Sequence, residues 1–303
     1  MDLFTLFRKM KWLLVDGFNL AFRAFYAMPS LTRPSDGFPV GAIHAWVRIL
    51  WKLQDQEAPC KIVIFFDKDG SQRHLSLHAE YKANRAETPP ELVLQFPELK
   101  LISEHFGFCI KEQSGVEADD LIASTAQALS ASGEEVWIAS ADKDFAQCVN
   151  DRVRLLAPPP PAQAKAGWLR MDAEKVREKF GVTPSQIVDY LSLIGDSVDN
   201  IPGLPGVGPK TAAMWLNKYG TIDEILNAKD VIEPIRFREI ISGATELLKL
   251  NRQLITFQTN FQTNLDAPYV SDLPACRTFF ERMEMKSTLK ELEQRAGKQL
   301  ELF

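Results

Sequence analysis

The sequence has few cysteines and histidines, and it has no long apolar run. Its 303 residues include four cysteines without a CxxC pair and four histidines without an HExxH pattern, so we expect neither a disulfide framework nor a zinc site. No stretch approaches the roughly 18 apolar residues of a membrane span, and the apolar part of MDLFTLFRKM is too short for a secretory signal. These absences predict a cytoplasmic protein that starts at Met1 or Met10 and has no membrane partner.

Basic residues are also slightly fewer than acidic ones. The chain has 35 Lys and Arg against 40 Asp and Glu, a formal net charge of -5. Such a balance argues at first against a nucleic acid as partner, because proteins that bind nucleic acids usually have a basic surface. The hydrophobic fraction of 46% and the charged fraction of 25% are those of a globular protein. At about 150 residues per domain, the length suits two domains.

Three short apolar runs indicate buried strands in the first half of the chain. They cover residues 12–15, 62–66 and 136–139, and each is followed within a few residues by an aspartate. Helical patterns cover residues 41–53, 91–106 and 118–130. Alternating strands and helices predict an α/β fold with a mainly parallel central sheet, whose strand ends collect functional residues. The polar, basic stretch from residue 68 predicts a functional flap or arch at about 68–100.

The second half has mainly helical patterns. Four prolines at residues 158–161 predict a surface spacer. After them, helices are expected at residues 172–180, 184–194, 210–219, 222–227, 244–254 and 278–296. Thr183 followed by Pro184 is typical of a helix start. We therefore predict an α/β domain over residues 1–180 and a helical domain over residues 181–303.

Short acidic motifs are the first functional signal. Nine carboxylates fall into five motifs, of which three follow predicted strands, one opens a helix and one precedes a Gly-rich turn. They are Asp16, Asp67, Glu117, Asp119, Asp120, Asp142, Asp144, Asp196 and Asp199. Mg²⁺ prefers oxygen ligands, and two ions about 4 Å apart suit in-line displacement at phosphorus. Any one motif could be a helix cap or a turn, but the five together predict a two-ion site.

A Gly-rich segment at residues 203–213, GLPGVGPKTAA, is the second signal. It resembles a helix–hairpin–helix element, in which glycines allow close approach of a phosphate and the next helix start attracts an anion. The residues expected to contact DNA are Gly203, Gly206, Gly208, Lys210 and Thr211. A Walker A loop is excluded because Pro209 separates Gly208 from Lys210, whereas a plain interhelical turn stays open.

Together these motifs resemble those of the 5′ nucleases of the flap endonuclease superfamily. The resemblance is closest to the N-terminal domain of bacterial DNA polymerase I and its free-standing bacterial relatives. It rests on LLVDGFNLAFRAFYA, IVIFFDKDG, RHLSLHAEYKANRAETPPEL, GVEADDLIAS, ASADKDFAQ and YLSLIGDSVDNIPGLPGVGPKTA, and more weakly on FFERMEMKSTLKEL. It covers residues 11 to about 295 and leaves open whether the chain is free-standing or a fragment of a longer polymerase.

The resemblance implies a fold and roles for individual residues. The fold would be a PIN-like 5′ nuclease core with a helical arch and a C-terminal helix–hairpin–helix (H3TH) domain. All nine acids match the family's metal-binding positions. Lys82 and Arg85 match a catalytic basic pair that contacts the scissile phosphate. Tyr81 matches a position that stacks on a base, and Arg23 is implied to hold a phosphate; packing for Tyr81 and a solvated face for Arg23 stay open. In related hairpins, carbonyl groups bind K⁺.

The resulting prediction is a Mg²⁺-dependent 5′→3′ DNA exonuclease and 5′-flap endonuclease that removes primers and flaps in replication and repair. It would use two Mg²⁺, with Mn²⁺ as a substitute, and act as a monomer on DNA with 5′ flaps, nicks or RNA-primed ends. The alternatives are a weakly active or non-catalytic DNA-junction binder and a small single-domain ribonuclease, a type without arch or hairpin. Setting aside the nine acids leaves 35 basic against 31 acidic residues, so the acidic total does not argue against DNA.

Overall fold

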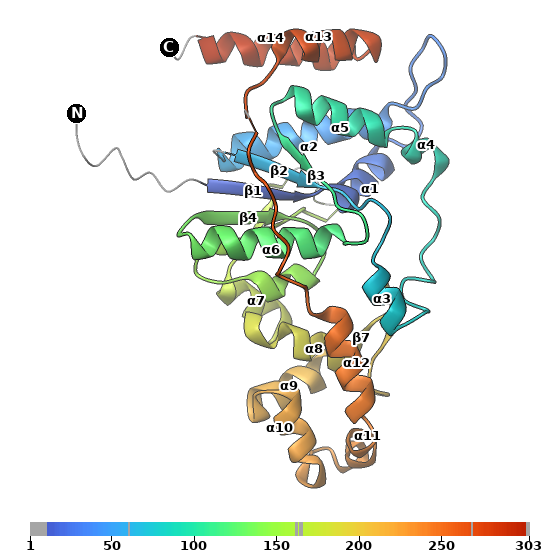
Figure 1. Cartoon of the computed structure of the whole chain (residues 1–303), viewed down its shortest axis with the longest axis vertical. Helices are drawn as coiled ribbons and strands as arrows, with labels where there is room; N and C mark the ends of the chain where they lie inside the picture. The colour runs from blue at the N-terminus through green and yellow to red at the C-terminus, as the bar shows by residue number, and fades with distance from the viewer. Residues whose placement is uncertain (1–10, 60, 161–162, 164–165, 268, 301–303) are drawn as a thin grey trace, which may run out of the picture. The chain divides into compact units, whose positions relative to one another are not determined.

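The computed structural model describes residues 11–59, 61–160, 163, 166–267 and 269–300 (Figure 1). The chain divides into two compact units. The first unit comprises Met1–Phe66, Glu87–Glu112 and Asn264–Phe303, and the second comprises Asp67–Ala86 and Gln113–Thr263. Among the helices of the described residues, none is both long and apolar enough to cross a bilayer. The predictions for the start at Met1 or Met10, for Cys60 and for Pro161 lie outside the described residues.

The first unit contains three parallel strands and six helices among its described residues. The strands are β1 (Lys11–Asp16), β2 (Lys61–Phe65) and β3 (Cys109–Lys111), with β2 in the middle. The helices are α1 (Gly17–Ala27), α2 (Gly41–Glu57), α4 (Pro90–Val93), α5 (Phe96–His105), α13 (Leu273–Arg282) and α14 (Lys286–Leu300). The apolar run of β1 is fully buried, as the absence of polar alternation predicts for a parallel strand.

A close contact fixes where β1 ends and α1 begins. A Cβ on Gly17 would lie 2.6 Å from the Phe65 carbonyl oxygen, so only glycine allows α1 to start against β2. Asp16 ends β1 and caps α1, because its carboxylate accepts a hydrogen bond from the Asn19 N–H at 3.1 Å. The first predicted metal ligand is therefore held at a strand end, as the sequence predicted.

The second unit combines five strands with many helices among its described residues. Its strands are β4 (Glu135–Ala139), β5 (Val153–Ala157) and β6 (Leu169–Met171), and the short pair β7 (Gly195–Asp196) and β8 (Ile201–Pro202). β4 and β5 pair in parallel, whereas β5–β6 and β7–β8 are antiparallel. The α-helices are α3 (Gln72–Leu77), α6 (Ala118–Ala131), α7 (Ala173–Phe180), α8 (Ile187–Ile194), α9 (Pro209–Tyr219), α10 (Ile222–Asn227), α11 (Arg238–Ser242) and α12 (Thr245–Ile255). The 3₁₀ turns are η2 (Asp144–Cys148), η4 (Pro184–Gln186), η5 (Lys229–Val231) and η6 (Ile235–Phe237).

Most predicted elements are present, and two predicted helices are wrong. Residues 91–106 form α4 and α5 instead of one helix, because Pro97 has no N–H to continue the helical hydrogen bonds. Residues 278–296 belong to α13 and α14, which are separated where Glu284 adopts a φ of 55°. The sequence also missed β3, β5 and β6, which are short or lie beside the proline run. The predicted helix start at Thr183 is confirmed by a capping box with Gln186.

Candidate functional site

The structure distributes the predicted site residues over the two units. Asp16 lies at the end of β1 and the half-buried Arg23 lies on α1, both in the first unit. The other eight acids, the basic pair with Tyr81 and the whole Gly-rich hairpin lie in the second unit. Burial lowers the pKa of Arg23 below its usual range. The second unit therefore contains most of the candidate site, and its geometry can be followed residue by residue.

Three carboxylates of the second unit form a candidate metal centre. One oxygen each of Asp144, Asp196 and Asp199 lies within 4.8 Å of the other two. Asp144 begins η2, Asp196 ends β7, and Asp199 lies in the turn between β7 and β8. Their exposed fractions are 8%, 7% and 9%, so they are held away from solvent. Three buried anions so close together repel one another unless a cation or a proton offsets their charge.

Asp144 shows the strongest sign of this repulsion. Its pKa is raised well above the usual range by burial and then by the charges of Asp142 and Asp196. Asp142 contacts it directly, because the Asp142 carboxylate accepts a hydrogen bond from the Asp144 N–H at 2.9 Å. Burial, with the charges of Asp199 and Asp196, raises the pKa of Asp142 as well.

The donor set of this centre fits a divalent cation. Within the described residues, the Asp144 Oδ1 atom is buried and has no hydrogen-bond partner. A hard cation such as Mg²⁺ prefers oxygen ligands, and this centre offers three carboxylates, one of which has an oxygen without a hydrogen bond. The centre thus offers only oxygen ligands, and the Asp144 Oδ1 has no hydrogen-bond partner among the described residues that would compete with a metal ion.

A second acidic group lies at the start of α6. The Asp67 Oδ1 accepts a hydrogen bond from the Ala118 N–H at 2.8 Å, and Glu117 is the N-cap residue. Burial raises the pKa of Asp67. Asp120 accepts a hydrogen bond from the Gln258 N–H at 2.8 Å, and burial together with the charge of Glu117 raises its pKa to about 6. Asp119 lies beside it in the first turn of α6.

Two basic side chains after α3 bond directly to acids of both groups. The Lys82 Nζ lies 2.8 Å from the Glu117 Oε1, and the Arg85 guanidinium donates to the Asp199 carboxylate. Burial alone would lower the pKa of Lys82, but the charges of Glu117, Asp119 and Asp199 raise it above its usual range. Both side chains are therefore cationic, and both lie beside carboxylates of the candidate site.

The backbone at Lys82 has an unusual conformation. Its φ is 57°, in the left-handed region that costs a non-glycine residue about 1–2 kcal/mol. The Lys82 N–H donates to the Asp199 carbonyl oxygen at 3.1 Å, which helps to hold this conformation. Outliers of this kind are concentrated at functional sites, because surrounding contacts must compensate for them.

Tyr81 is buried among these residues. Its ring stacks on His74 with a centroid separation of 4.5 Å, and its exposed fraction is 7%. Burial, followed by the charges of Glu117 and Asp199, raises the pKa of Tyr81 well above its usual range, so the phenol stays protonated. This geometry corresponds to the packing alternative left open above. Stacking on a base would require the ring to leave His74.

Sequence reasoning missed two residues at this site. The Lys143 Nζ lies 2.9 Å from the Asp196 Oδ2, and its position between Asp142 and Asp144 was the only available signal. Burial alone would lower the pKa of Lys143, but the hydrogen bond to Asp196 raises it. The second residue is His74, whose ring stacks on Tyr81; burial lowers its pKa, so the imidazole is neutral.

The Gly-rich hairpin joins α8 to α9 through β7 and β8. Leu204 and Val207 are buried, whereas Gly206 and Lys210 are exposed. Gly206 needs to be glycine because its φ is 73°. Gly203 has a packing role, since a Cβ there would lie 2.2 Å from the Ile194 carbonyl oxygen.

The last part of the hairpin leads into α9 and is open. Gly208 is the N-cap of α9, has open space around its missing side chain, and is followed by Pro209 as the first helical residue. Lys210 and the half-buried Thr211 lie in the first turn. Free N–H groups at such a helix start can bind an anion.

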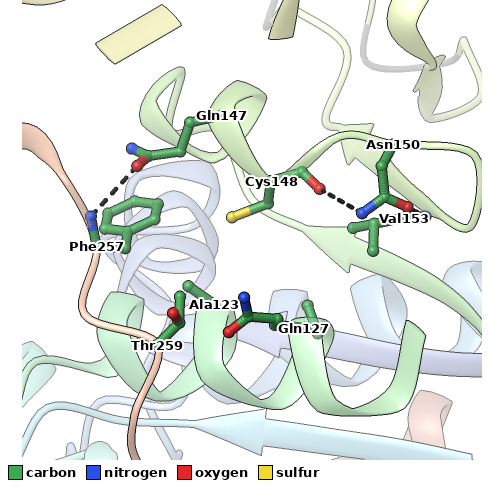
Figure 2. Close-up of a pocket in the computed structure, with 9 residues that line it drawn as sticks. Ala123, Gln127, Gln147, Cys148, Asn150, Val153, Phe257 and Thr259 are labelled. Atoms are coloured by element: carbon green, nitrogen blue, oxygen red, sulfur yellow. Dashed lines mark hydrogen bonds between the residues drawn. The ribbon is translucent and has the colours of Figure 1, made fainter. Parts of the chain in front are cut away.

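A pocket of about 180 Å³ is lined by none of the three carboxylates Asp144, Asp196 and Asp199. Figure 2 shows residues that line it. The pocket is lined by α6, by the region of η2 and by the segment after α12, including Gln127, Gln147, Cys148 and Phe257. The Gln147 side chain accepts a hydrogen bond from the Phe257 N–H at 3.2 Å and donates one to the Ile255 carbonyl at 3.0 Å. None of its lining residues is acidic, and burial raises the pKa of the Cys148 thiol to about 12. The pocket thus lacks the carboxylates through which proteins usually bind Mg²⁺.

Both halves of the chain match domain models of one family of known proteins. The model of the 5′-3′ exonuclease N-terminal resolvase-like domain matches residues 11–181, and that of the 5′-3′ exonuclease C-terminal SAM fold matches residues 182–274. The chain is 36% identical over 296 residues to the 5′-3′ exonuclease of Aquifex aeolicus. This match covers 96% of the present chain and 98% of the Aquifex protein. It is 37% identical over 260 residues to DNA polymerase I of Rhizobium leguminosarum, covering 84% of this chain and only 25% of the polymerase.

Solved structures show the same fold at lower identity. The bacteriophage T5 5′-exonuclease, described with bound divalent metal ions, has a TM-score of 0.67 at 22% identity and covers 91% of this chain and 98% of its own. The catalytic core of Rad2 in complex with a DNA substrate has a TM-score of 0.64 at 14% identity and covers 94% of this chain and 91% of its own. The predicted α/β fold, with a mainly parallel sheet and a helical C-terminal domain, is confirmed.

Proposed function

The chain belongs to the 5′-3′ exonuclease family, and from this premise we propose that it hydrolyses DNA phosphodiester bonds as a 5′→3′ exonuclease and 5′-flap endonuclease. Its role would be the removal of primers and flaps in replication and repair. The observation that supports this proposal best is the close centre of Asp144, Asp196 and Asp199, of which Asp199 is also paired with Arg85. The specificity for flaps, nicks and RNA-primed ends, and the monomeric state, are parts of the proposal.

The proposal includes two Mg²⁺, for which Mn²⁺ could substitute. Asp144, Asp196 and Asp199 would hold one ion, and the acids around the start of α6, together with Asp142, would supply further ligands. Asp16, at the end of β1, is proposed as a metal ligand as well. Bound divalent ions would polarise a phosphoryl oxygen of the DNA and lower the pKa of a bound water. The chain's part is to keep the carboxylates fixed, and the hydrogen bonds at Asp67, Asp120 and Asp142 do so.

Lys82 and Arg85 would transfer their hydrogen bonds from carboxylates to the scissile phosphate. Both are charged, and both lie in the segment after α3. Each donates to a carboxylate, and a divalent cation could take its place as the partner of that carboxylate. A phosphate that enters this centre would meet two donors whose charge stabilises the developing negative charge. Arg23 on α1 is proposed to hold a further phosphate of the DNA.

The hairpin between α8 and α9 would bind the duplex through phosphates. Gly206 and Lys210 are exposed, and Gly208 and Thr211 lie at the positive start of α9, so together they would position DNA without reading its sequence. A K⁺ on the hairpin carbonyls is part of this proposal. Replacing K⁺ by Li⁺ is expected to weaken duplex binding, measured by fluorescence anisotropy at constant ionic strength, and an unchanged affinity would remove the ion from the proposal.

Two glycines of the hairpin should respond differently to substitution. Gly203→Ala is expected to destabilise the protein by at least about 1–3 kcal/mol, because the new Cβ would clash with the backbone at Ile194. Gly208→Ala should cost only about 0.5–1 kcal/mol, because alanine is a poorer N-cap than glycine although its Cβ would enter open space. It should lower duplex affinity by roughly tenfold, the equivalent of one charge-assisted hydrogen bond. Thermal unfolding and anisotropy measure both effects, and a normal affinity for Gly208→Ala would contradict the contact.

The enzymatic proposal is tested with a 5′-flap DNA labelled at its 5′ end. Mg²⁺ should support cleavage near the junction, and a chelator should stop it. If no Mg²⁺-dependent product forms while the DNA still binds, the alternative of a non-catalytic junction binder is favoured. The full set of nine acids supports the enzyme over that alternative. We also propose the domain division at residues 180 and 181, which the limits of the two family models support.

A further inference from the structure

Two residues of α3 bond to backbone carbonyls at the C-terminal end of α12. The Arg73 guanidinium donates to the Gln253 carbonyl at 2.6 Å, and the His74 Nε2 lies 3.1 Å from the Leu254 carbonyl oxygen. The last carbonyls of a helix have no partner within the helix, so these contacts satisfy groups that would otherwise need water. Helix α3, which precedes Lys82 and Arg85, is therefore held to α12 by two hydrogen bonds.

The His74 ring is fixed in one orientation. Because the Leu254 carbonyl can only accept, Nε2 must donate to it. The other nitrogen, Nδ1, lies 2.8 Å from the Ser71 hydroxyl, which can donate in return. The exposed fraction of His74 is 3%, so water does not compete for these hydrogen bonds.

The fixed imidazole positions Tyr81. The two rings are stacked at an angle of 17°. In this position the Tyr81 hydroxyl lies 3.3 Å from the Glu117 Oε2 and 3.4 Å from the Asp199 Oδ2. Lys82 occupies the other oxygen of Glu117, so both oxygens of that carboxylate face a donor from the same segment. Tyr81 thus touches one acid at the start of α6 and one acid of the three-carboxylate centre.

Another residue of α12 bonds to the hairpin region. The Asn251 side-chain amide donates to the Ser192 carbonyl at 3.0 Å and to the Pro202 carbonyl at 2.7 Å. Ser192 lies on α8, and Pro202 ends β8, directly before the Gly-rich segment. One helix therefore contacts both the segment proposed to bind duplex DNA and the residue that orients Tyr81.

We propose that His74 is a positioning residue for the metal site. It holds Tyr81 so that the phenol hydroxyl shares its single proton between the Glu117 and Asp199 carboxylates and orients both for a divalent ion. Through its own hydrogen bond to Leu254, His74 also links this arrangement to α12. The inference rests on the proposed function of those acids. It differs from base stacking by Tyr81, since the working group is the hydroxyl and not the ring face.

Three variants separate the hydroxyl from the ring and from its support. Tyr81→Phe keeps the stacked ring, Tyr81→Ala removes it, and His74→Ala removes the support. We measure Mn²⁺ affinity of the DNA-free protein by calorimetry, and kcat and KM on a 5′-flap DNA. Tyr81→Phe should weaken Mn²⁺ binding and lower kcat by about tenfold, the lower end of the effect of groups that orient metal ligands, with KM unchanged. His74→Ala should show the same pattern, and adding Tyr81→Phe to it should cause little further loss.

Tyr219→Phe is the matched control, because the buried Tyr219 hydroxyl has no hydrogen-bond partner within the described residues. Normal Mn²⁺ affinity and kcat in Tyr81→Phe, with a raised KM in Tyr81→Ala, would overturn the inference in favour of base stacking. A lower melting temperature of His74→Ala with unchanged kcat would reduce His74 to a structural role. A wild-type protein that binds no Mn²⁺ would overturn the proposed function and this inference with it.

Discussion

Replacing Asp144 by asparagine is expected to lower Mg²⁺-dependent cleavage of a 5′-flap DNA by at least about 10³-fold. A divalent ion supplies several kcal/mol of charge stabilisation in such reactions, and each 1.36 kcal/mol corresponds to a factor of about ten. Asp144 offers a buried oxygen that has no protein partner among the described residues, and it lies within the three-carboxylate centre. Asparagine keeps the shape of the side chain but not its charge. Single-turnover cleavage with excess enzyme measures this loss without contributions from product release.

The same change should stabilise the metal-free protein at neutral pH. The pKa of Asp144 is raised in the folded state by burial and by Asp142, whereas in the unfolded chain it is about 3.9. Between these two values the folded state binds more protons than the unfolded state, so stability falls as pH rises. Asparagine does not titrate. In a chelator, the melting temperature of Asp144→Asn should therefore fall less steeply than that of the wild type from about pH 4 upward.

Addition of Mg²⁺ should separate the two proteins in the opposite direction. An ion that binds only the folded state raises its stability, so the wild type should gain in melting temperature and Asp144→Asn should gain less. Asp151→Asn is a matched control, because Asp151 is an exposed aspartate of the same unit. It should change neither cleavage nor the pH dependence. Wild-type cleavage by Asp144→Asn, or an unchanged slope with pH, would contradict the assignment of Asp144 to the metal centre.

The positions of the acids could be predicted because they depend on local sequence. An apolar run that ends in aspartate specifies both a buried strand and a carboxylate at its end, and this holds for Asp16 at the end of β1. The start of α6 was equally readable, since acids are favoured in the first turn of a helix. Such patterns need only a few neighbouring residues.

The contacts among these residues could not be predicted, because they join segments far apart in the chain. Lys82 and Glu117 are separated by 35 positions, and His74 and Leu254 by 180. The orientation of Tyr81 follows from both contacts and has no local signal. Gly203 shows the converse case, in which a glycine assigned to DNA contact is also required by packing against Ile194. The helix break at Glu284 likewise has no proline or glycine to announce it.

Replacing Lys82 by alanine is expected to lower kcat by about 10²–10³-fold, the usual cost of losing one donor that stabilises charge in the transition state. Duplex affinity should change by less than about threefold, since one charge among many phosphate contacts contributes little to binding. The geometry favours this difference. The Lys82 ammonium points at Glu117 within the acidic site, and its backbone is held at a φ of 57° by a hydrogen bond to Asp199. A lysine that served only to attract DNA would need neither feature.

The matched control for this prediction is Lys68→Ala. Lys68 is an exposed lysine in the segment between β2 and α3, so its removal takes the same charge from the same region without touching an acid of the site. If Lys82 acts on the scissile phosphate, Lys82→Ala loses turnover at saturating DNA and Lys68→Ala does not. If both variants lose affinity and turnover in equal proportion, Lys82 only anchors DNA. Because Lys82 also neutralises buried Glu117, the melting temperature of Lys82→Ala in Mg²⁺ must be compared with the wild type, so that a loss of folded protein is not taken for a loss of turnover.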